Sequence, residues 1–278
     1  MSWMGVRMDG VAKWMESLSG ETWRKMEKEA SRLRKIGALG NNIAKKLRAQ
    51  TLLRFLGMPF QKLFDKTGST HRFLTEKAVE ILRADGFAEA ATFYHGWLDT
   101  IVSGNYWADL LWMNATHHYS PRTRRGLWVW AGASDQLRNW WNLAMVSWKK
   151  GKIERSMFML GACLHIVQDC CQPYHSNCLV FDGHQKYERW ADSHKDEYVA
   201  THGGLYGVSP KPEGWAVANA ELSCSYLVAV ASELDSERDR ATAILLPRAM
   251  RTSAGFLLFF RDGTGAAAAK AREKKAAG

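Results

Sequence analysis

The chain has 278 residues, of which 46% are hydrophobic, and this predicts one large domain, alone or with extensions, around a sizeable core. The net charge of +10 is uneven, because residues 1–66 carry 14 basic and 6 acidic side chains whereas residues 67–261 carry 20 of each. A basic surface is therefore excluded for the central part. No run reaches the roughly 18 apolar residues of a membrane-spanning helix, and no clear secretory signal is visible.

The first sixty residues have the pattern of charged amphipathic helices. One or two helices are expected over residues 1–35, followed by a break at GALGNN. The stretch IAKKLRAQTLLRFLG then places apolar side chains near one helical face and basic side chains on the other. We expect residues 1–60 to form a basic amphipathic extension or a propeptide. This extension would bind anionic lipid or nucleic acid, or else form a pair of solvated helices.

A series of helices is predicted to follow. The stretch DKTGST is expected to be a turn in which Ser69 and Thr70 can cap the next helix. Helices are predicted over residues 71–86 and 87–104, from 105 into a loop at Ser120–Pro121, from a cap at Ser134 to 152, and over 153–171. The last of these is the most apolar, and Pro173 is expected to end it.

The remainder of the chain is also predicted to be helical. Further helices are expected from residue 183, over 213–232 and over 236–261, with a kink at Pro247. Residues 263–278, rich in Ala and Lys, are expected to be a low-complexity, frayed tail. Because no useful stretch alternates with a period of two, the predicted fold class is all-α, with the main domain at residues 61–262.

Two short segments combine residues that bind metals. In LHIVQDCCQPYHSN, His165 and Asp169 are four residues apart and share one helical face. Pro173 then breaks the helix and directs His175 elsewhere, so that this stretch can serve two metal ions.

Further ligands lie on both sides of that stretch. His184 and Glu188 repeat the four-residue spacing, and with His175 they form a nitrogen and oxygen set that suits zinc. Additional donors lie upstream at Asp109, His117, His118 and His71.

The five cysteines do not form paired C-x-x-C motifs, which argues against a cysteine zinc finger. They are Cys163, Cys170, Cys171, Cys178 and Cys224. Cys170 and Cys171 are interpreted as packing residues, and Cys178 with Cys224 is a candidate disulfide.

The stretch HIVQDCCQPYHSN resembles the signature of bacterial zinc-dependent phospholipases C, the group that contains clostridial alpha-toxin. That signature is His, three residues, Asp, three residues, Pro, one residue, His, two residues and Asn. The matching residues are His165, Asp169, Pro173, His175 and Asn177. Two positions depart from it, because Ile166 replaces a usual Tyr and Gln168 replaces a usual small residue.

Three other stretches extend the resemblance to about residues 67–260. TGSTHRFLTEKAVEIL resembles the segment with the first histidine ligand, here His71. YWADLLWMNATHHYSP resembles the segment with an aspartate and the second histidine, here Asp109 and His117, with His118 as the alternative. GHQKYERWADS resembles the segment with the last two ligands, His184 and Glu188.

The resemblance implies a helical zinc-dependent phospholipase C/nuclease-like domain with three zinc ions in one cleft. The implied ligands are His117, His165, Asp109 and Asp169 for one ion, Asp169 with His71 for the next, and His175, His184 and Glu188 for the third. The implied reaction cleaves a phospholipid to diacylglycerol and a phosphorylated headgroup. Asp109 would orient or deprotonate the attacking water, or act only as a ligand.

One departure affects the zinc count. In the family, an N-terminal Trp completes one zinc shell, but no Trp stands in the corresponding region near Met58–Gln61. Either the preceding segment is cleaved, or another group completes the shell, or two ions bind instead of three. The family is usually exported, which implies secretion, although no clear signal peptide is visible.

Two other functions are compatible with a similar ligand order. Zinc-dependent single-strand nucleases usually end their last ligand pair in Asp, where this chain has Glu188, and they need a basic groove, whereas residues 67–261 are neutral. A membrane-binding protein with a degenerate zinc site is the second alternative, and the intact set of ligands argues against it. We therefore expect a phospholipid substrate and no specific nucleic acid; headgroup preference and oligomeric state are not indicated.

Overall fold

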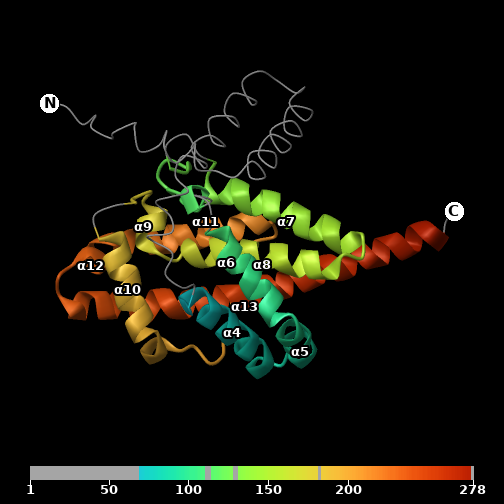
Figure 1. The fold of residues 1–278 in the computed structure, drawn as a ribbon, viewed down its shortest axis with the longest axis horizontal. Coiled ribbons are helices and arrows are strands. Elements are labelled where there is room, and N and C mark those ends of the chain that lie inside the picture. The colour runs from blue at the N-terminus through green and yellow to red at the C-terminus, as the bar shows by residue number, and fades with distance from the viewer. Residues whose placement is uncertain (1–68, 110–113, 128–130, 181–182, 277–278) are drawn as a thin grey trace, which may run out of the picture. The chain divides into compact units, whose positions relative to one another are not determined.

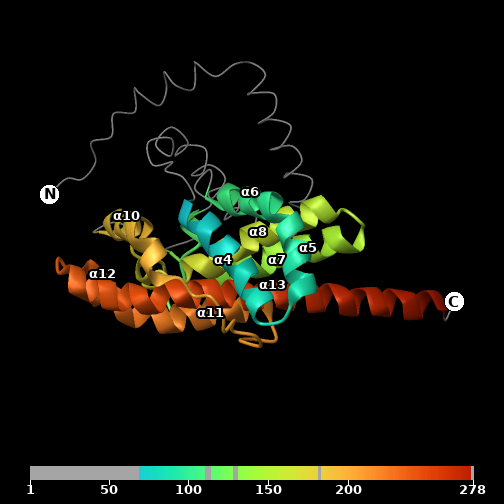
Figure 2. The same ribbon diagram turned by 90° about the horizontal axis from the view of Figure 1, so that it is seen from below.

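Helix α8, Ile153–Asp169, forms the centre of the computed structural model, and most of its side chains are buried. Helices α6, Leu98–Ala108, and α7, Ala133–Lys149, pack along it, and α13, Asp235–Ala276, crosses the same core (Figures 1 and 2). The structure describes residues 69–109, 114–127, 131–180 and 183–276, with side chains as far as Gly265. The predicted extension over residues 1–60 lies outside these ranges.

Helix α4, Ser69–Ala84, brings His71 to the core and packs against α13 and against α5, Ala88–Gly96. Its buried apolar residues recur at helical spacing: Phe73, Leu74, Ala78, Val79, Ile81 and Leu82. The hydroxyls of Ser69 and Thr70 donate to Oδ1 of Asp192 at 2.5 and 2.6 Å. Since Asp192 belongs to α10, His184–His194, this contact ties the start of α4 to that helix.

The crossing of α6 and α8 depends on two glycines. A Cβ atom on Gly104 would lie 1.7 Å from the carbonyl oxygen of Phe158, and one on Gly161 would lie 1.9 Å from that of Ile101. Because each glycine faces the backbone of the other helix, the two helices are in direct backbone contact. This contact fixes Asp109, directly after α6, against the C-terminal end of α8.

A second, smaller core lies where the short helices meet α10 and the start of α13. The short elements are α9 (Pro173–Ser176), η2 (Lys195–Tyr198), α11 (Pro212–Ser223), η3 (Cys224–Tyr226) and α12 (Leu227–Ala231). This core consists of Tyr174, Tyr187, Ala191, Val230, Ala241 and Leu245. It supports α9 and α10, which carry His175, His184 and Glu188.

The predicted all-α class is confirmed, since the described residues form helices and only one isolated β-bridge, between Ser120 and Arg125. Several predicted boundaries are wrong. The helix expected over residues 213–232 is divided into α11, η3 and α12. The helix expected over residues 87–104 is interrupted at Trp97, and α6 then continues past Gly104 to Ala108. Gly104 suits a helix end by propensity, but here it provides the close approach to α8. The expected cap at Ser134 is replaced by Gly132, which precedes α7.

Helix α13 extends to Ala276, so the backbone is helical through most of the segment where the sequence predicts fraying. Ala and Lys, which dominate that segment, favour helix. Over Asp235–Gly265 this helix is long and apolar enough to cross a membrane, but 61% of its most apolar window is buried in the protein, as in a core helix. All five cysteines are free thiols, so the Cys178–Cys224 disulfide does not form.

Candidate metal centre

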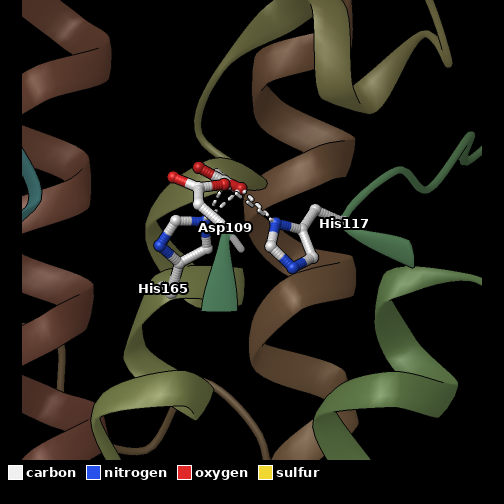
Figure 3. Close-up of side chains that lie close together, drawn as sticks. Asp109, His117 and His165 are labelled. Carbon is white, nitrogen blue, oxygen red and sulfur yellow. Dashed lines mark hydrogen bonds and ion pairs between the residues drawn. The ribbon is translucent and has the colours of Figure 1, made fainter. Parts of the chain in front are cut away.

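Four predicted ligands from three segments converge at the end of α8. Asp109, His117, His165 and Asp169 offer ligand atoms that all lie within 4.8 Å of one another. His117 Nδ1 and His165 Nε2 each lie 2.9 Å from Asp169 Oδ2, and His165 Nε2 lies 3.2 Å from Asp109 Oδ1. Figure 3 shows Asp109, His117 and His165 pointing toward one another. This arrangement can enclose one cation with nitrogen and oxygen donors.

His71 reaches the same carboxylate from α4. Its Nε2 atom lies 3.3 Å from Oδ1 of Asp169, the oxygen that His117 and His165 leave free. Its ring stacks on that of His165, with 4.1 Å between the ring centroids. Asp169 can therefore serve two cations, one through each oxygen.

The second group consists of His175, His184 and Glu188, whose ligand atoms also lie within 4.8 Å of one another. Glu188 Oε1 is 2.8 Å from His184 Nε2 and 3.6 Å from His175 Nε2. The Gln172 side chain accepts from the backbone N–H groups of Tyr174 and His175, which caps α9 at its start, where Pro173 is the first helical residue. The structure thus separates His175 from the helix of His165, and Nδ1 of His175 still lies 3.7 Å from Asp169.

Five buried imidazole nitrogens in or beside these groups have no hydrogen-bond partner: His117 Nε2, His118 Nδ1, His165 Nε2, His175 Nδ1 and His184 Nε2. Two of them, on His165 and His184, nevertheless lie within 2.9 Å of a carboxylate oxygen, outside hydrogen-bond geometry. Buried polar atoms are normally paired. Close nitrogen and oxygen atoms without a hydrogen bond between them fit donors to a shared cation.

The protonation of the cluster fits the same interpretation. Burial lowers the pKa of His117 to about 4 and lowers that of His118 well below its ordinary value, which keeps both imidazoles neutral at pH 7. Burial also opposes a charge on His165, but Asp109 and Asp169 outweigh it and raise the pKa of His165 well above its usual value. Negative charge at the centre therefore attracts a cation, while neutral imidazoles supply lone pairs.

His118 lies beside the second group, whereas its neighbour His117 lies in the first. The His118 ring stacks on that of His175 at 4.6 Å between centroids, and its centroid is 6.2 Å from that of His184. The sequence placed His118 among the upstream donors, and the family resemblance offered it as the alternative to His117. Since both rings are buried next to ligand groups, the pair of adjacent histidines contacts both.

A model of the family described as "Zinc dependent phospholipase C" matches residues 70–233. The chain belongs to this family. The predicted family is thereby confirmed, and the matched segment contains all eight candidate ligands, from His71 to Glu188. The zinc dependence of the family agrees with the nitrogen and oxygen donors of both groups.

Several phospholipases C are similar to this chain. The phospholipase C of Clostridium haemolyticum is 30% identical over 168 residues, which cover 52% of this chain and 42% of that protein. The phospholipase C of Bacillus cereus is 25% identical over 232 residues, which cover 71% of this chain and 82% of that protein. The aligned part of this chain therefore spans less than half of the clostridial protein.

Solved structures share the fold. The alpha toxin of Clostridium absonum matches 70% of this chain with a TM-score of 0.62 and 20% identity, over 63% of its own length. The alpha toxin of an avian strain of Clostridium perfringens matches 69% of this chain with a TM-score of 0.60. These two similarities support the helical fold of this chain.

Proposed function

We propose that this chain is a zinc-dependent phospholipase C, which hydrolyses a phospholipid to diacylglycerol and a phosphorylated headgroup. The observation that carries the proposal is the position of Asp169, whose carboxylate lies within 3.7 Å of nitrogens from His71, His117, His165 and His175. A carboxylate among imidazoles is suited to a cluster of zinc ions, and the family membership directs that cluster to phospholipid hydrolysis.

The donor set supports three zinc positions. The first would be held by Asp109, His117, His165 and Asp169, the second by His71 and Asp169, and the third by His175, His184 and Glu188. The second position has the fewest donors among the described residues, so its occupancy depends most on a further ligand. We therefore propose three ions, or two if no further group completes that shell.

The chemistry follows from charge. Bound zinc would neutralise the phosphate and lower the pKa of the attacking water. Asp109 has 42% of its side chain exposed, whereas Asp169 has 8%, so Asp109 is the carboxylate of the first group that can reach a substrate. Burial by itself raises the pKa of Asp109, but His165 lowers it below the ordinary value. An ionised Asp109 can thus orient or deprotonate the water.

We expect zinc removal to abolish headgroup release from mixed phospholipid vesicles, because the donors cannot stabilise the phosphate without the ion. The measurement compares the purified chain before chelation, after chelation and after zinc is restored. Chelator already saturated with zinc is the matched control and should leave release unchanged. Release that persists from protein with no detectable zinc would contradict the proposal.

The same assay distinguishes the two alternatives, neither of which the family membership favours. A zinc-loaded chain that releases no headgroup but cuts single-stranded DNA would be a nuclease. A zinc-loaded chain that binds vesicles and releases neither product would be a membrane-binding protein without this activity.

We also propose that residues 1–60 are an extension of a domain at residues 61–262, with 263–278 as a tail, and that the extension binds anionic membrane. Residues 1–66 hold a basic excess that residues 67–261 lack. Deletion of residues 1–56 is expected to weaken binding to anionic vesicles and to reduce the salt dependence of binding. Neutral vesicles are the control. Undiminished binding to anionic vesicles by the deletion variant would contradict this assignment.

A further inference from the structure

Two buried amide side chains lie directly behind His71 and behind His165 of the first ligand group. Asn105 on α6 is 1% exposed, and Gln168 on α8, one residue before Asp169, is 3% exposed. Their side chains are 3.1 Å apart, with Asn105 Nδ2 donating to Gln168 Oε1. Neither residue belongs to the group of His and Asp ligands, and each instead contacts the Nδ1 atom of a histidine.

The orientation of the Gln168 amide is determined by its far side. Its Nε2 atom donates to Oγ of Ser253 and to Oγ1 of Thr75, both at 3.2 Å. The Thr75 hydroxyl already donates to the carbonyl oxygen of His71 at 2.8 Å, so its oxygen is left to accept. The amide nitrogen must therefore face Thr75, and Oε1 must face the opposite way.

This orientation assigns the tautomer of both histidines. Gln168 Oε1 can only accept, so His71 Nδ1, at 2.8 Å, is the donor. Asn105 uses its NH2 group on Gln168, so its Oδ1 accepts from His165 Nδ1 at 3.0 Å. When each ring is neutral, as a metal ligand must be, its proton is on Nδ1 and its lone pair is on Nε2.

Those lone pairs lie on the side of the carboxylates. Nε2 of His71 is 3.3 Å from Asp169 Oδ1, and Nε2 of His165 is 3.2 Å from Asp109 Oδ1. If the Gln168 amide were reversed, its NH2 group would face His71, Asn105 would have to reverse as well, and both Nε2 atoms would carry protons. One amide orientation thus determines whether both rings can bind a cation through Nε2.

We propose that Gln168 and Asn105 are a pair of positioning residues that hold His71 and His165 as Nδ1–H tautomers and so present both Nε2 atoms to zinc. The pair links the two ions that share Asp169, because a single hydrogen-bonded chain joins the histidine of one to the histidine of the other. The zinc part of this inference rests on the proposed function, whereas the tautomer part does not.

The test is a measurement of imidazole tautomers by nitrogen-15 NMR on the full zinc-free chain, at a pH at which His71 is neutral. His71 is expected to be Nδ1–H in the natural sequence. Gln168→Met removes the acceptor with little change of volume, and His71 should then shift toward Nε2–H. Gln168→Glu keeps an acceptor and should retain Nδ1–H, since the Ser253 hydroxyl can turn to donate to it.

Zinc affinity, measured by competition with a chromophoric chelator, is the second readout. Gln168→Met is expected to weaken the zinc at His71 by about 10- to 100-fold, the usual effect of losing a residue that supports a metal ligand. Gln168→Glu should recover most of that affinity. Ser103→Ala, which removes an exposed hydroxyl on α6 that donates to the carbonyl oxygen of Asp99, is the control and should leave the affinity near that of the natural chain.

The result that overturns the proposal is an Nε2–H tautomer of His71 in the natural sequence, or equal zinc affinity in Gln168→Met. The first of these needs no variant, so it remains decisive if Gln168→Met does not fold. Because tautomers are read without substrate, a chain that shows Nδ1–H and releases no headgroup would contradict the proposed function and leave this inference standing.

Discussion

Asp169→Asn is expected to lower headgroup release by more than about 100-fold. Removing a residue that only supports a metal ligand costs up to about 100-fold in metal affinity or activity. The larger effect is expected because Asp169 itself faces four histidines. Asparagine keeps the size of the side chain but removes its negative charge. It also replaces one carboxylate oxygen with an NH2 group, which donates hydrogen bonds and cannot bind a cation. Zinc content and release should therefore fall together, as measured by metal analysis and the vesicle assay.

Asp99→Asn is the matched control for this substitution. Asp99 also lies on an α-helix, but its side chain is 88% exposed and pairs only with Arg72 in the described contacts. The same chemical change there should leave zinc content and release unaltered. Full zinc content with full release in Asp169→Asn would show that this carboxylate does not hold the ions.

Gly161→Ala is expected to lower the free energy of unfolding by about 3 kcal/mol or more, at or above the upper end of the usual cost of overpacking a core. The added Cβ would lie 1.9 Å from the carbonyl oxygen of Ile101, and a backbone atom cannot rotate away as a side chain would. Helices α6 and α8 must then separate, which also moves Asp109 relative to His165. Thermal unfolding and zinc affinity measure both consequences.

Gly96→Ala provides the comparison. Gly96 is the last residue of α5, and a Cβ there would meet no atom within 4 Å. Alanine is the better helix former, so the free energy of unfolding should stay level or rise slightly. Equal melting temperatures for Gly161→Ala and the natural chain would mean that the helices tolerate a wider crossing.

The grouping of the ligands could be predicted from the sequence, because it depends on short-range spacings and on family motifs. The four-residue spacing of His165 and Asp169, and of His184 and Glu188, is a property of any helix. The break at Pro173 is equally local, and the structure does direct His175 to the second group. The metal role of these residues remains a prediction that the zinc measurements test.

The contacts that support the ligands could not be predicted in the same way. Gln168 meets His71 across 97 positions and Asn105 across 63, and nothing in the spacing of these residues pairs them. Gln168 was visible in the sequence only as a departure from the signature. The close approach at Gly104 was hidden for a similar reason, because a glycine that permits a helix crossing has the same local appearance as one that ends a helix.

The buried imidazole nitrogens without hydrogen-bond partners have a consequence for the lifetime of the protein. A buried polar atom without a partner costs about 1–3 kcal/mol, and five such nitrogens lie within one small region. A cation that binds those facing the carboxylates, such as Nε2 of His165 and of His184, stabilises only the folded chain, by an amount that grows with the free concentration of the ion. Resistance to proteases should therefore follow the zinc supply, so that the same polypeptide is durable where zinc is plentiful and short-lived where it is scarce.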